Sequence, residues 1–391
     1  MYLDYTPEER KLRDELREYF ADLMTPELRA EVEMSEGGGP LYRKALRKMG
    51  ADGWLGVGWP KEYGGQGRSP IEQFIFSDEV QRVGFPLPFL TINSVGPTIM
   101  KYGSDEQKAE FLPRILRGDV LFAIGYSEPS AGTDLAALRT RAVRDGDSYV
   151  INGSKVFTSL AEFSDYIWLA ARTDPEAKKH RGISMFMVDV KSPGYKCTPI
   201  WTVGGIRTNA TYYEDVRVPA AMRVGPENEG WGLIVNQLNH ERISLVPVGP
   251  TERIFEEVRR WAQTTRLPDG RRVIDQDWVR LKLARVRAKL DVIRLLCWRQ
   301  AWCMTTDTLN FAEASTVKVY GTEFYVEAFR DLLEVIGHRG FIKRGSPEVV
   351  LRGLLEMIHR SALILTFGGG TNEIQRDIIA MAGLGMPREL R

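Results

Sequence analysis

Two segments between residues 125 and 159 combine small, hydroxyl-bearing and aromatic residues in a way that suits a ligand with a ring and a phosphate. The first reads GYSEPSAGTD from Gly125 to Asp134, and the second reads NGSKVFTS from Asn152 to Ser159. Small residues let the backbone approach a ligand closely, and exposed N–H groups can bind anionic oxygens. The two segments are therefore candidates for a cofactor site, although a β-hairpin loop without a ligand could carry the same residue types.

The pattern of apolar residues predicts how these segments are positioned. Helical spacing follows a capping-box pattern at Thr6, an alternation with period two replaces it in the middle of the chain, and helical spacing then returns. We therefore expect an α+β protein. The expected domains are 1–119, helical, 120–225, a β domain, and 226–391, helical. The expected strands are 120–124, 148–151, 166–171, 183–190 and 211–218.

The longest predicted helix, from about residue 231 to 261, contains Pro247 and Pro250 with Gly249 between them. An interior proline removes a backbone hydrogen bond and clashes with the preceding turn, at a cost of about 3 kcal/mol. We therefore expect this helix to kink or break there, although a loop between two shorter helices would explain the same residues. The later helices are predicted at 276–305, 312–336 and 347–365.

The composition excludes several classes of function. The 53 basic and 52 acidic residues leave a net charge of +1, which provides no general attraction to nucleic acid or to a membrane surface. No stretch approaches the roughly 20 apolar residues of a membrane span, and the charged N-terminus is unlike a secretory signal. The three cysteines and four scattered histidines lack the spacing of a disulfide framework or a metal site. We expect a cytoplasmic protein without a bound metal.

The segment from Gly125 to Asp134 resembles the flavin-binding signature of the acyl-CoA dehydrogenases. The sequence LTFGGGTNEIQ from Leu365 to Gln375 resembles the family segment Y-E-G-T-x-x-I-Q. The resemblance covers essentially the whole chain. It implies the acyl-CoA dehydrogenase fold, with an N-terminal helical domain, a middle β-barrel or sandwich domain and a C-terminal four-helix bundle. It also implies FAD as the cofactor and an acyl-CoA thioester as the substrate.

The resemblance also implies which residues hold the flavin. Tyr126 and Ser127 are expected against the edge of the isoalloxazine ring, and Gly132 and Thr133 are expected to face the phosphates. Phe157 stands where many relatives have a tryptophan near the flavin. The remaining positions implied to contact the cofactor are Thr158 and Ser159, with Thr371 and Glu373 near its adenosine half.

The catalytic base has to be within hydrogen-bond reach of the α-proton of the thioester. Many family members carry this base as a glutamate in the C-terminal segment, where this chain has Gly369. Some members place it on the long helix after the β domain, and Glu241 matches that position. We therefore predict that Glu241 is the base, the alternative being a solvated helix charge. The resemblance further implies that the Gly369 N–H polarises the thioester carbonyl and that Arg242 supports the CoA moiety.

A closer resemblance, to the actinobacterial acyl-CoA dehydrogenases of steroid side-chain degradation, rests on segments such as DGWLGVGWP from Asp52 and NQLNHER from Asn236. It implies a steroid-CoA thioester. In homotetrameric relatives a neighbouring subunit completes each flavin site through R-x-x-F-G and Q-x-x-G-G-x-G. Residues 265–273 lack the first motif, and Glu334 and His338 depart from the second. Because a carboxylate near a pyrophosphate is unfavourable, we expect a related second subunit to supply these residues in an α2β2 heterotetramer.

The identity of the electron acceptor and the role of the chain have alternatives. The resemblance implies transfer of electrons to an electron-transfer flavoprotein. An acyl-CoA oxidase would instead use O₂, and the choice depends on how well the reduced flavin is shielded. A non-catalytic structural subunit of an acyl-CoA dehydrogenase complex would explain Gly369.

Overall fold

The computed structural model describes residues 4–33, 37–241, 246–306 and 308–387, and its first part is helical. The predicted capping box is present, because the Glu9 amide donates to Thr6 Oγ1 at 3.2 Å and the Thr6 amide donates to the Glu9 carboxylate at 2.8 Å. Leu12, Leu16 and Phe20 then form a buried face. The N-terminal helices are α1 Pro7–Leu23, α2 Pro26–Val32, α3 Pro40–Ala51, α4 Pro70–Arg82, the π-helical η3 Leu90–Val95, α5 Gly96–Tyr102 and α6 Asp105–Leu116.

An eight-stranded sheet follows, in the order β6-β7-β3-β2-β4-β5-β8, with β1 paired in parallel with β4. The strands are β1 Phe122–Gly125, β2 Arg141–Asp145, β3 Ser148–Lys155, β4 Tyr166–Arg172, β5 Ile183–Asp189, β6 Tyr195–Trp201, β7 Arg207–Pro219 and β8 Arg223–Val224. The five predicted strands are present with shifted ends, whereas β2, β6 and β8 were not predicted. Most side chains of β2 and β6 are exposed or half-buried, so these strands lack a regular apolar alternation.

The second helical region carries the predicted interruption. Its helices are α7 Gly230–Glu241, α8 Gly249–Thr264, α9 Asp277–Thr305, α10 Phe311–Ile336, α11 Leu354–Ser361 and α12 Asn372–Ile378. The expected break at Pro247 and Pro250 is confirmed, because residues 246–248 are not helical. The single helix predicted at 347–365 is wrong. Leu351 and Arg352 have positive φ angles, of 49° and 58°. A regular α-helix cannot include these two residues, so α11 begins only after them, at Leu354.

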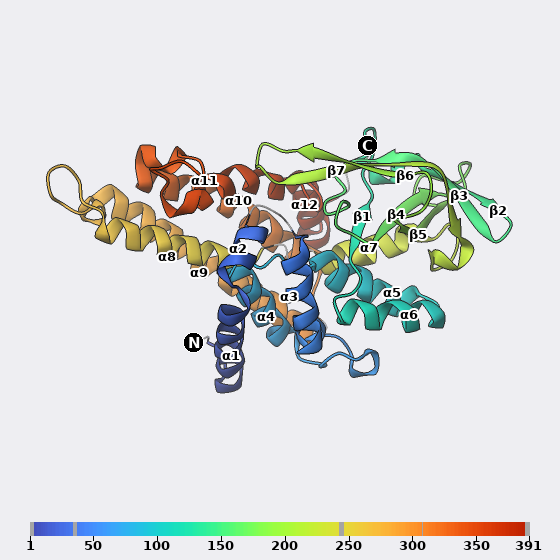
Figure 1. The fold of residues 1–391 in the computed structure, drawn as a ribbon, viewed down its shortest axis with the longest axis horizontal. Coiled ribbons are helices and arrows are strands. Elements are labelled where there is room, and N and C mark those ends of the chain that lie inside the picture. The colour runs from blue at the N-terminus through green and yellow to red at the C-terminus, as the bar shows by residue number, and fades with distance from the viewer. Residues whose placement is uncertain (1–3, 34–36, 242–245, 307, 388–391) are drawn as a thin grey trace.

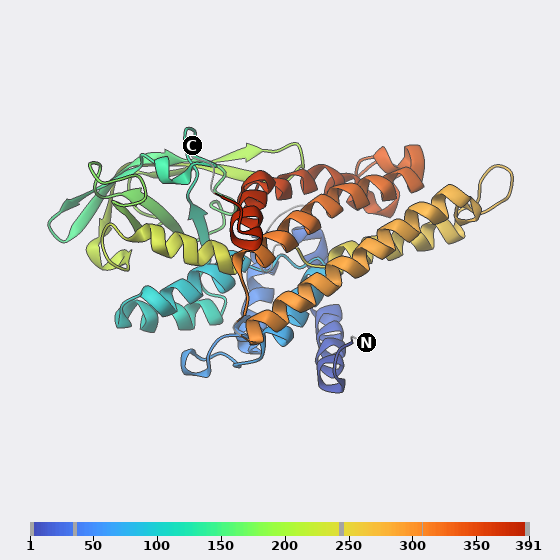
Figure 2. The same ribbon diagram turned by 180° about the vertical axis from the view of Figure 1, so that it is seen from behind.

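The sheet forms one end of the molecule, and the paired helices α8 and α9 extend to the other (Figure 1). Seen from behind, α9 runs from that end back to the centre (Figure 2). One buried apolar cluster joins the N-terminal helices to the sheet and to α7, a second fills the C-terminal helices, and a third lies within the β domain. The helix α7 is therefore seated between the sheet and the N-terminal helices. Across the part of the chain that the structure describes, every helix is too short or too polar to cross a bilayer.

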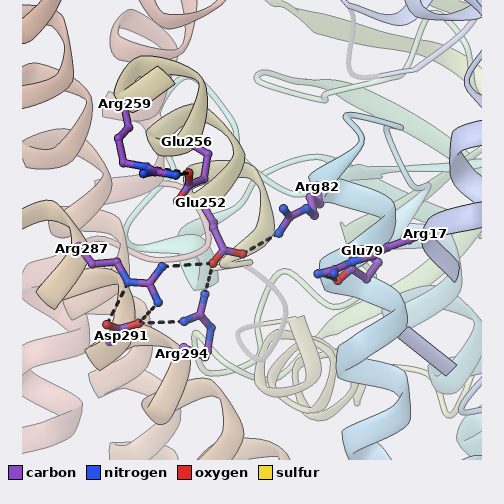
Figure 3. A network of polar contacts seen from close by, with 9 residues as sticks. All are labelled: Arg17, Glu79, Arg82, Glu252, Glu256, Arg259, Arg287, Asp291 and Arg294. Carbon is purple, nitrogen blue, oxygen red and sulfur yellow. Dashed lines mark hydrogen bonds and ion pairs between the residues drawn. The ribbon is translucent and has the colours of Figure 1, made fainter. Parts of the chain in front are cut away.

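One carboxylate on α8 connects the N-terminal helices to the C-terminal helices (Figure 3). Glu252 pairs with Arg82 of α4 at 2.6 Å and with Arg294 of α9 at 2.5 Å, and Arg287 lies 3.7 Å away. Burial by itself would raise the pKa of Glu252, but Arg294 and Arg82 outweigh burial and lower it. Three helices that are distant in sequence are thus held together at one site.

Replacement of Glu252 by glutamine should lower the free energy of unfolding by about 1–3 kcal/mol, because two partly buried arginines lose their charged acceptor. Since the pKa is lowered on folding, the stabilisation is complete above the unfolded-state pKa of about 4.5 and is lost as the pH falls below it. Urea unfolding at pH 7 and pH 4 measures both effects.

The matched control is Glu256→Gln. Glu256 pairs with Arg259 on the same helix at 2.6 Å (Figure 3), and its loss should change the free energy of unfolding by less than about 0.5 kcal/mol. Equal losses of unfolding free energy in the two variants would show that Glu252 contributes no more to stability than an ion pair within one helix.

Candidate functional site

The first candidate segment leaves the sheet at the end of β1, and its aromatic side chain turns into the protein. The Tyr126 hydroxyl donates to Gln237 Oε1 on α7 at 2.5 Å and accepts the Trp168 indole N–H from β4 at 3.2 Å. Tyr126 and Gln237 are both buried. The hydroxyl of Tyr126 therefore ties this segment to the helix that carries the predicted base.

A buried ion pair joins the two candidate segments. Lys155 Nζ, at the end of β3, donates to Glu128 Oε1 at 2.8 Å and to the Tyr126 carbonyl at 3.0 Å. The Glu128 carboxylate also accepts the amides of Arg139 and Thr140, at 2.7 and 2.8 Å. Neither Glu128 nor Lys155 was predicted to have a role. The presence of a charged residue in each motif was the feature of the sequence that could have indicated the pair.

Both members of this pair are charged near neutral pH. Burial lowers the pKa of Lys155 to about 8, against the opposing effect of Glu128. Burial alone would raise the pKa of Glu128, but Lys155 and the Thr140 donors outweigh it and the pKa falls. Removal of either partner would leave the other charge buried without compensation. The pair therefore holds the two segments in one relative position.

The surface beside this pair has room for a phosphate. The Val156 amide donates to the Ser127 carbonyl at 2.9 Å, so the two segments run next to each other. Gly132 and Thr133 are exposed, and a Cβ added to Gly132 would meet no atom within 4 Å. An open backbone of this kind allows anionic oxygens to approach its N–H groups.

The second segment presents an aromatic ring and unpaired polar atoms. Phe157 is 65% exposed and has a φ of 60°, a conformation that is costly for a bulky residue. Among the described residues, Thr158 Oγ1 and Asn209 Oδ1 are buried without a hydrogen-bond partner. Ser159 Oγ lies 3.2 Å from Thr208 Oγ1. An exposed ring, backbone strain and unsatisfied polar atoms at one place fit a flavin.

The predicted base lies at the end of α7. This helix packs closely on β5 at its start, where a Cβ on Gly230 would come within 3.0 Å of the strand backbone. It ends at Glu241, four residues and about one turn beyond Gln237. The side chain of Glu241 and the whole of Arg242 lie outside the described residues. The structure thus places the backbone of Glu241 one turn from the contact with Tyr126.

A pocket of about 160 Å³ borders the turn between α7 and α8. Its walls come from that turn, α4, η3, the start of α5, α9 and the loop at Gly58 and Trp59. Most of the lining is apolar and includes Trp59, Phe74, Pro247 and Met304, while Asp78 of α4 contributes a carboxylate. A largely apolar pocket with few polar groups suits a small organic ligand.

The glycine segment near the C-terminus is shaped by a buried lysine. Gly369 and Gly370 have φ of 67° and 96°, which favours glycine at both positions. Lys318 of α10 is fully buried, and its Nζ donates to the Gly370 carbonyl and to Asn372 Oδ1, both at 2.7 Å. Lys318 was not among the predicted site residues. Its signal in the sequence was a lysine at helical spacing from the small residues Ser315 and Thr322, which are buried with it.

Thr371 and Glu373, implied to lie near the adenosine half of the cofactor, begin α12. Thr371 Oγ1 accepts the Ile374 amide at 3.3 Å and so caps the helix. Glu373 is exposed, and its own backbone N–H, together with the Thr371 hydroxyl, lowers its pKa. Hydrogen bonds therefore join the two β-domain segments to each other and to α7, whereas α10 holds the glycine segment.

Comparisons with protein families match most of the chain. Residues 6–119 match the model described as acyl-CoA dehydrogenase, N-terminal domain. Residues 123–216 match the middle-domain model, and residues 228–384 match the C-terminal-domain model.

Individual relatives match over the full length. The protein named acyl-CoA dehydrogenase FadE26, from Mycobacterium tuberculosis, is 56% identical over 400 residues, which cover 100% of both chains. Among solved structures, a chain of the ChsE4-ChsE5 complex from Mycobacterium tuberculosis is 56% identical, with a TM-score of 0.94 and 100% coverage of both chains. A chain of the solved Tcur3481-Tcur3483 steroid ACAD is 51% identical, with a TM-score of 0.94 and the same coverage.

Replacement of Lys155 by methionine should lower the free energy of unfolding by about 3 kcal/mol, because the Glu128 carboxylate stays buried without its cation. The double variant with Glu128→Gln should recover at least about 1 kcal/mol of that loss. Urea unfolding measures both values. Lys196→Met is the control, since the pair of Lys196 with Glu214 is exposed and its loss should cost less than about 0.5 kcal/mol. If the loss of stability in the double variant equalled the sum of the losses in Lys155→Met and Glu128→Gln measured separately, the two residues would not be a coupled pair.

Proposed function

Since the chain belongs to the acyl-CoA dehydrogenase family, whose members are oxidoreductases, we propose that it catalyses the FAD-dependent α,β-dehydrogenation of an acyl-CoA thioester. The family matches span all three regions of the chain. The groups around Gly132, Phe157 and Thr158 support FAD as the cofactor, because they combine an open backbone, an exposed ring and unpaired polar atoms.

The observation that carries the mechanism is the glycine at position 369. A glutamate there would have to adopt a left-handed backbone, at a cost of roughly 1–2 kcal/mol. The loop is therefore suited to glycine, and the base has to come from another element. Glu241 ends the helix that Gln237 connects to the proposed flavin segment. This placement supports Glu241 as the base.

The residues of the chain then have separate tasks in the reaction. Glu241 takes the α-proton of the thioester onto its carboxylate. The Gly369 N–H, in the loop held by Lys318, donates to the thioester carbonyl and stabilises the negative charge that develops there. Arg242 supports the CoA moiety. FAD, when bound, supplies the acceptor for the hydride that leaves the β-carbon, and an electron-transfer flavoprotein then receives the electrons.

We propose a steroid-CoA thioester as the substrate. One of the solved relatives is named a steroid ACAD. In this chain the helix after the sheet is interrupted at residues 246–248, and the turn contributes Val246 and Pro247 to the wall of the 160 Å³ pocket. An uninterrupted helix would continue through this region, so the break supports an acyl group that is broader than a straight chain.

We propose that a second, related subunit completes the flavin site in an α2β2 heterotetramer. Two of the similar solved structures are named as pairs of different proteins. Glu334, which stands where homotetrameric relatives have glutamine, pairs with Lys282 at 2.7 Å. Its carboxylate is thus directed to a lysine of its own chain, and His338, which follows α10, is exposed. A carboxylate at position 334 has no N–H to donate to a neighbouring pyrophosphate, whereas the glutamine of the homotetrameric relatives has an amide donor.

Replacement of Glu241 by glutamine should lower turnover about 10²–10⁴-fold and leave the flavin content unchanged, because the amide cannot accept the α-proton. Steady-state dehydrogenation with an artificial electron acceptor and the flavin absorbance measure the two quantities. Glu229→Gln, at a position just before α7, should keep near-normal turnover.

Near-normal turnover of Glu241→Gln would remove Glu241 from this role. Failure of the substrate to bleach the flavin even in the wild-type protein, with the base of any partner removed, would favour a non-catalytic structural subunit. Stoichiometric peroxide formation in air would identify an acyl-CoA oxidase.

The chain purified alone should contain much less flavin than the chain co-expressed with a relative that carries both R-x-x-F-G and Q-x-x-G-G-x-G. The complex should be an α2β2 tetramer with half as many flavins as chains, because each flavin needs both kinds of subunit. Light scattering and absorbance measure these quantities. A homotetramer with one tightly bound flavin per chain would overturn the heteromer.

A further inference from the structure

The turn between α7 and α8 is held by side chains from three other helices. The amide of Gly249 donates to Asp78 Oδ1 of α4 at 2.6 Å. The Tyr325 hydroxyl of α10 donates to the carbonyl of Pro247. The Cys297 thiol of α9 lies 3.6 Å from the carbonyl of Val246. These contacts, here called the turn clasp, fix the backbone that directly precedes α8.

The turn clasp and the pocket share their residues. Val246 and Pro247 of the turn line the pocket, and so do Asp78 and Cys297 of the clasp. Tyr325 and the Cys297 thiol contact carbonyl groups of the turn, whereas Asp78 accepts a hydrogen bond from a backbone amide. A shift of the turn would therefore move a wall of the pocket.

Glycine at position 249 lets α8 sit directly on α4. A Cβ there would come within 2.6 Å of the Asp78 carbonyl and 2.8 Å of the Arg82 side chain. The N-cap residue of α8, Val248, provides no side-chain hydrogen bond. Asp78 of α4 supplies the acceptor instead, and its carboxylate also faces the positive end of the α8 dipole.

The ionised form of Asp78 is maintained at a cost in stability. Burial raises its pKa to about 6, with Glu79 and Glu252 adding to the effect and the Gly249 amide opposing it. Between the unfolded-state value of 3.8 and about 6, the folded protein binds a proton that the unfolded chain does not, so stability falls as the pH rises through this range.

The environment of Asp78 is formed by several elements. The titratable or charged groups on the elements around it are Tyr5, Glu79, Arg82, Glu252, Arg294, Cys297 and Tyr325. Glu252 engages both Arg82 and Arg294 as ion pairs (Figure 3). The two arginines are thus committed to Glu252, while Asp78 accepts the Gly249 amide, which points to the turn as the reason for a carboxylate at this position.

We propose that Asp78 is a positioning residue that determines the substrate range: by anchoring the Gly249 amide, it holds the Val246–Pro247 wall in place and keeps the pocket wide enough for a bulky, rigid acyl group. The inference rests on the proposed function, since it takes the pocket as the site of the acyl group. Under this proposal a short acyl group ends before this wall, and we expect its binding not to depend on Asp78.

Binding rather than turnover tests the role of Asp78. The flavin-loaded enzyme is prepared with Glu241→Gln, so that thioesters bind without reacting, and isothermal titration calorimetry measures Kd for a steroid-CoA thioester and for butyryl-CoA. Asp78→Ala should weaken binding of the steroid-CoA thioester by about 10-fold or more and binding of butyryl-CoA by less than about 3-fold. The selectivity for the bulky thioester is the readout, because a general loss of structure would weaken both.

Asp78→Asn keeps an oxygen that can accept the Gly249 amide but removes the charge. It should bind the steroid-CoA thioester with intermediate affinity that does not change between about pH 5 and 7.5. The parent protein should approach that affinity as the pH falls through about 6. Glu79→Gln is the matched control, because Glu79 is a buried carboxylate next in sequence that pairs with Arg17 at 2.8 Å and lies outside the turn clasp. It should leave the selectivity unchanged.

Unchanged selectivity in Asp78→Ala, or an equal loss for both thioesters, would overturn the role of Asp78 while leaving the proposed function intact. If neither thioester binds to the parent protein, the proposed function fails, and the role of Asp78 fails with it.

Discussion

The arrangement of the candidate site depends on where one helix stops. The helix that follows the sheet cannot continue regularly through Pro247 and Pro250, because each proline lacks the amide that an interior helical position requires. Pro250 is instead tolerated in the first turn of α8, where its missing amide has no partner to lose. The residues that interrupt the helical pattern therefore also begin the next helix. The interruption at residues 246–248 consequently lies at the wall of the pocket rather than within one long continuous helix.

Two buried lysines shape the rest of the site. Lys155 holds the two β-domain segments together through Glu128 and a backbone carbonyl, and Lys318 holds the glycine segment through a carbonyl and Asn372. A buried ammonium is costly to desolvate, so it contributes little to net stability. Its several donors do impose one backbone path on a loop. In both places a lysine defines the shape of a segment whose own sequence is rich in glycine and small residues.

The shape of the pocket and the packing of the N-terminal helices on the C-terminal helices both depend on contacts at the start of α8. Glu252 pairs α8 with α4 and α9, while Asp78 anchors the start of the same helix on α4. The wall of the pocket is therefore attached to the interface between the N-terminal and C-terminal helices. A change in this interface would alter the space available to an acyl group even without a contact to the ligand.

The sequence by itself determined the features that depend on neighbouring residues. The capping box at Thr6, the break near Pro247 and the order of helical and β regions follow from residue types a few positions apart. The motifs around Phe157 and Gly369 were also recognisable, because each is continuous in the chain. The strands β2 and β6 were missed, since a mostly exposed strand has no regular apolar pattern.

Only the tertiary structure decided which groups meet. It turned the Tyr126 hydroxyl inward to Gln237, paired Glu128 with Lys155, and brought the Asp78 carboxylate to the amide of Gly249, 171 residues later. Local residue preferences carry no information about such partners. A buried polar group is stable only beside a complementary group, and the packing of whole helices and strands determines where that group lies.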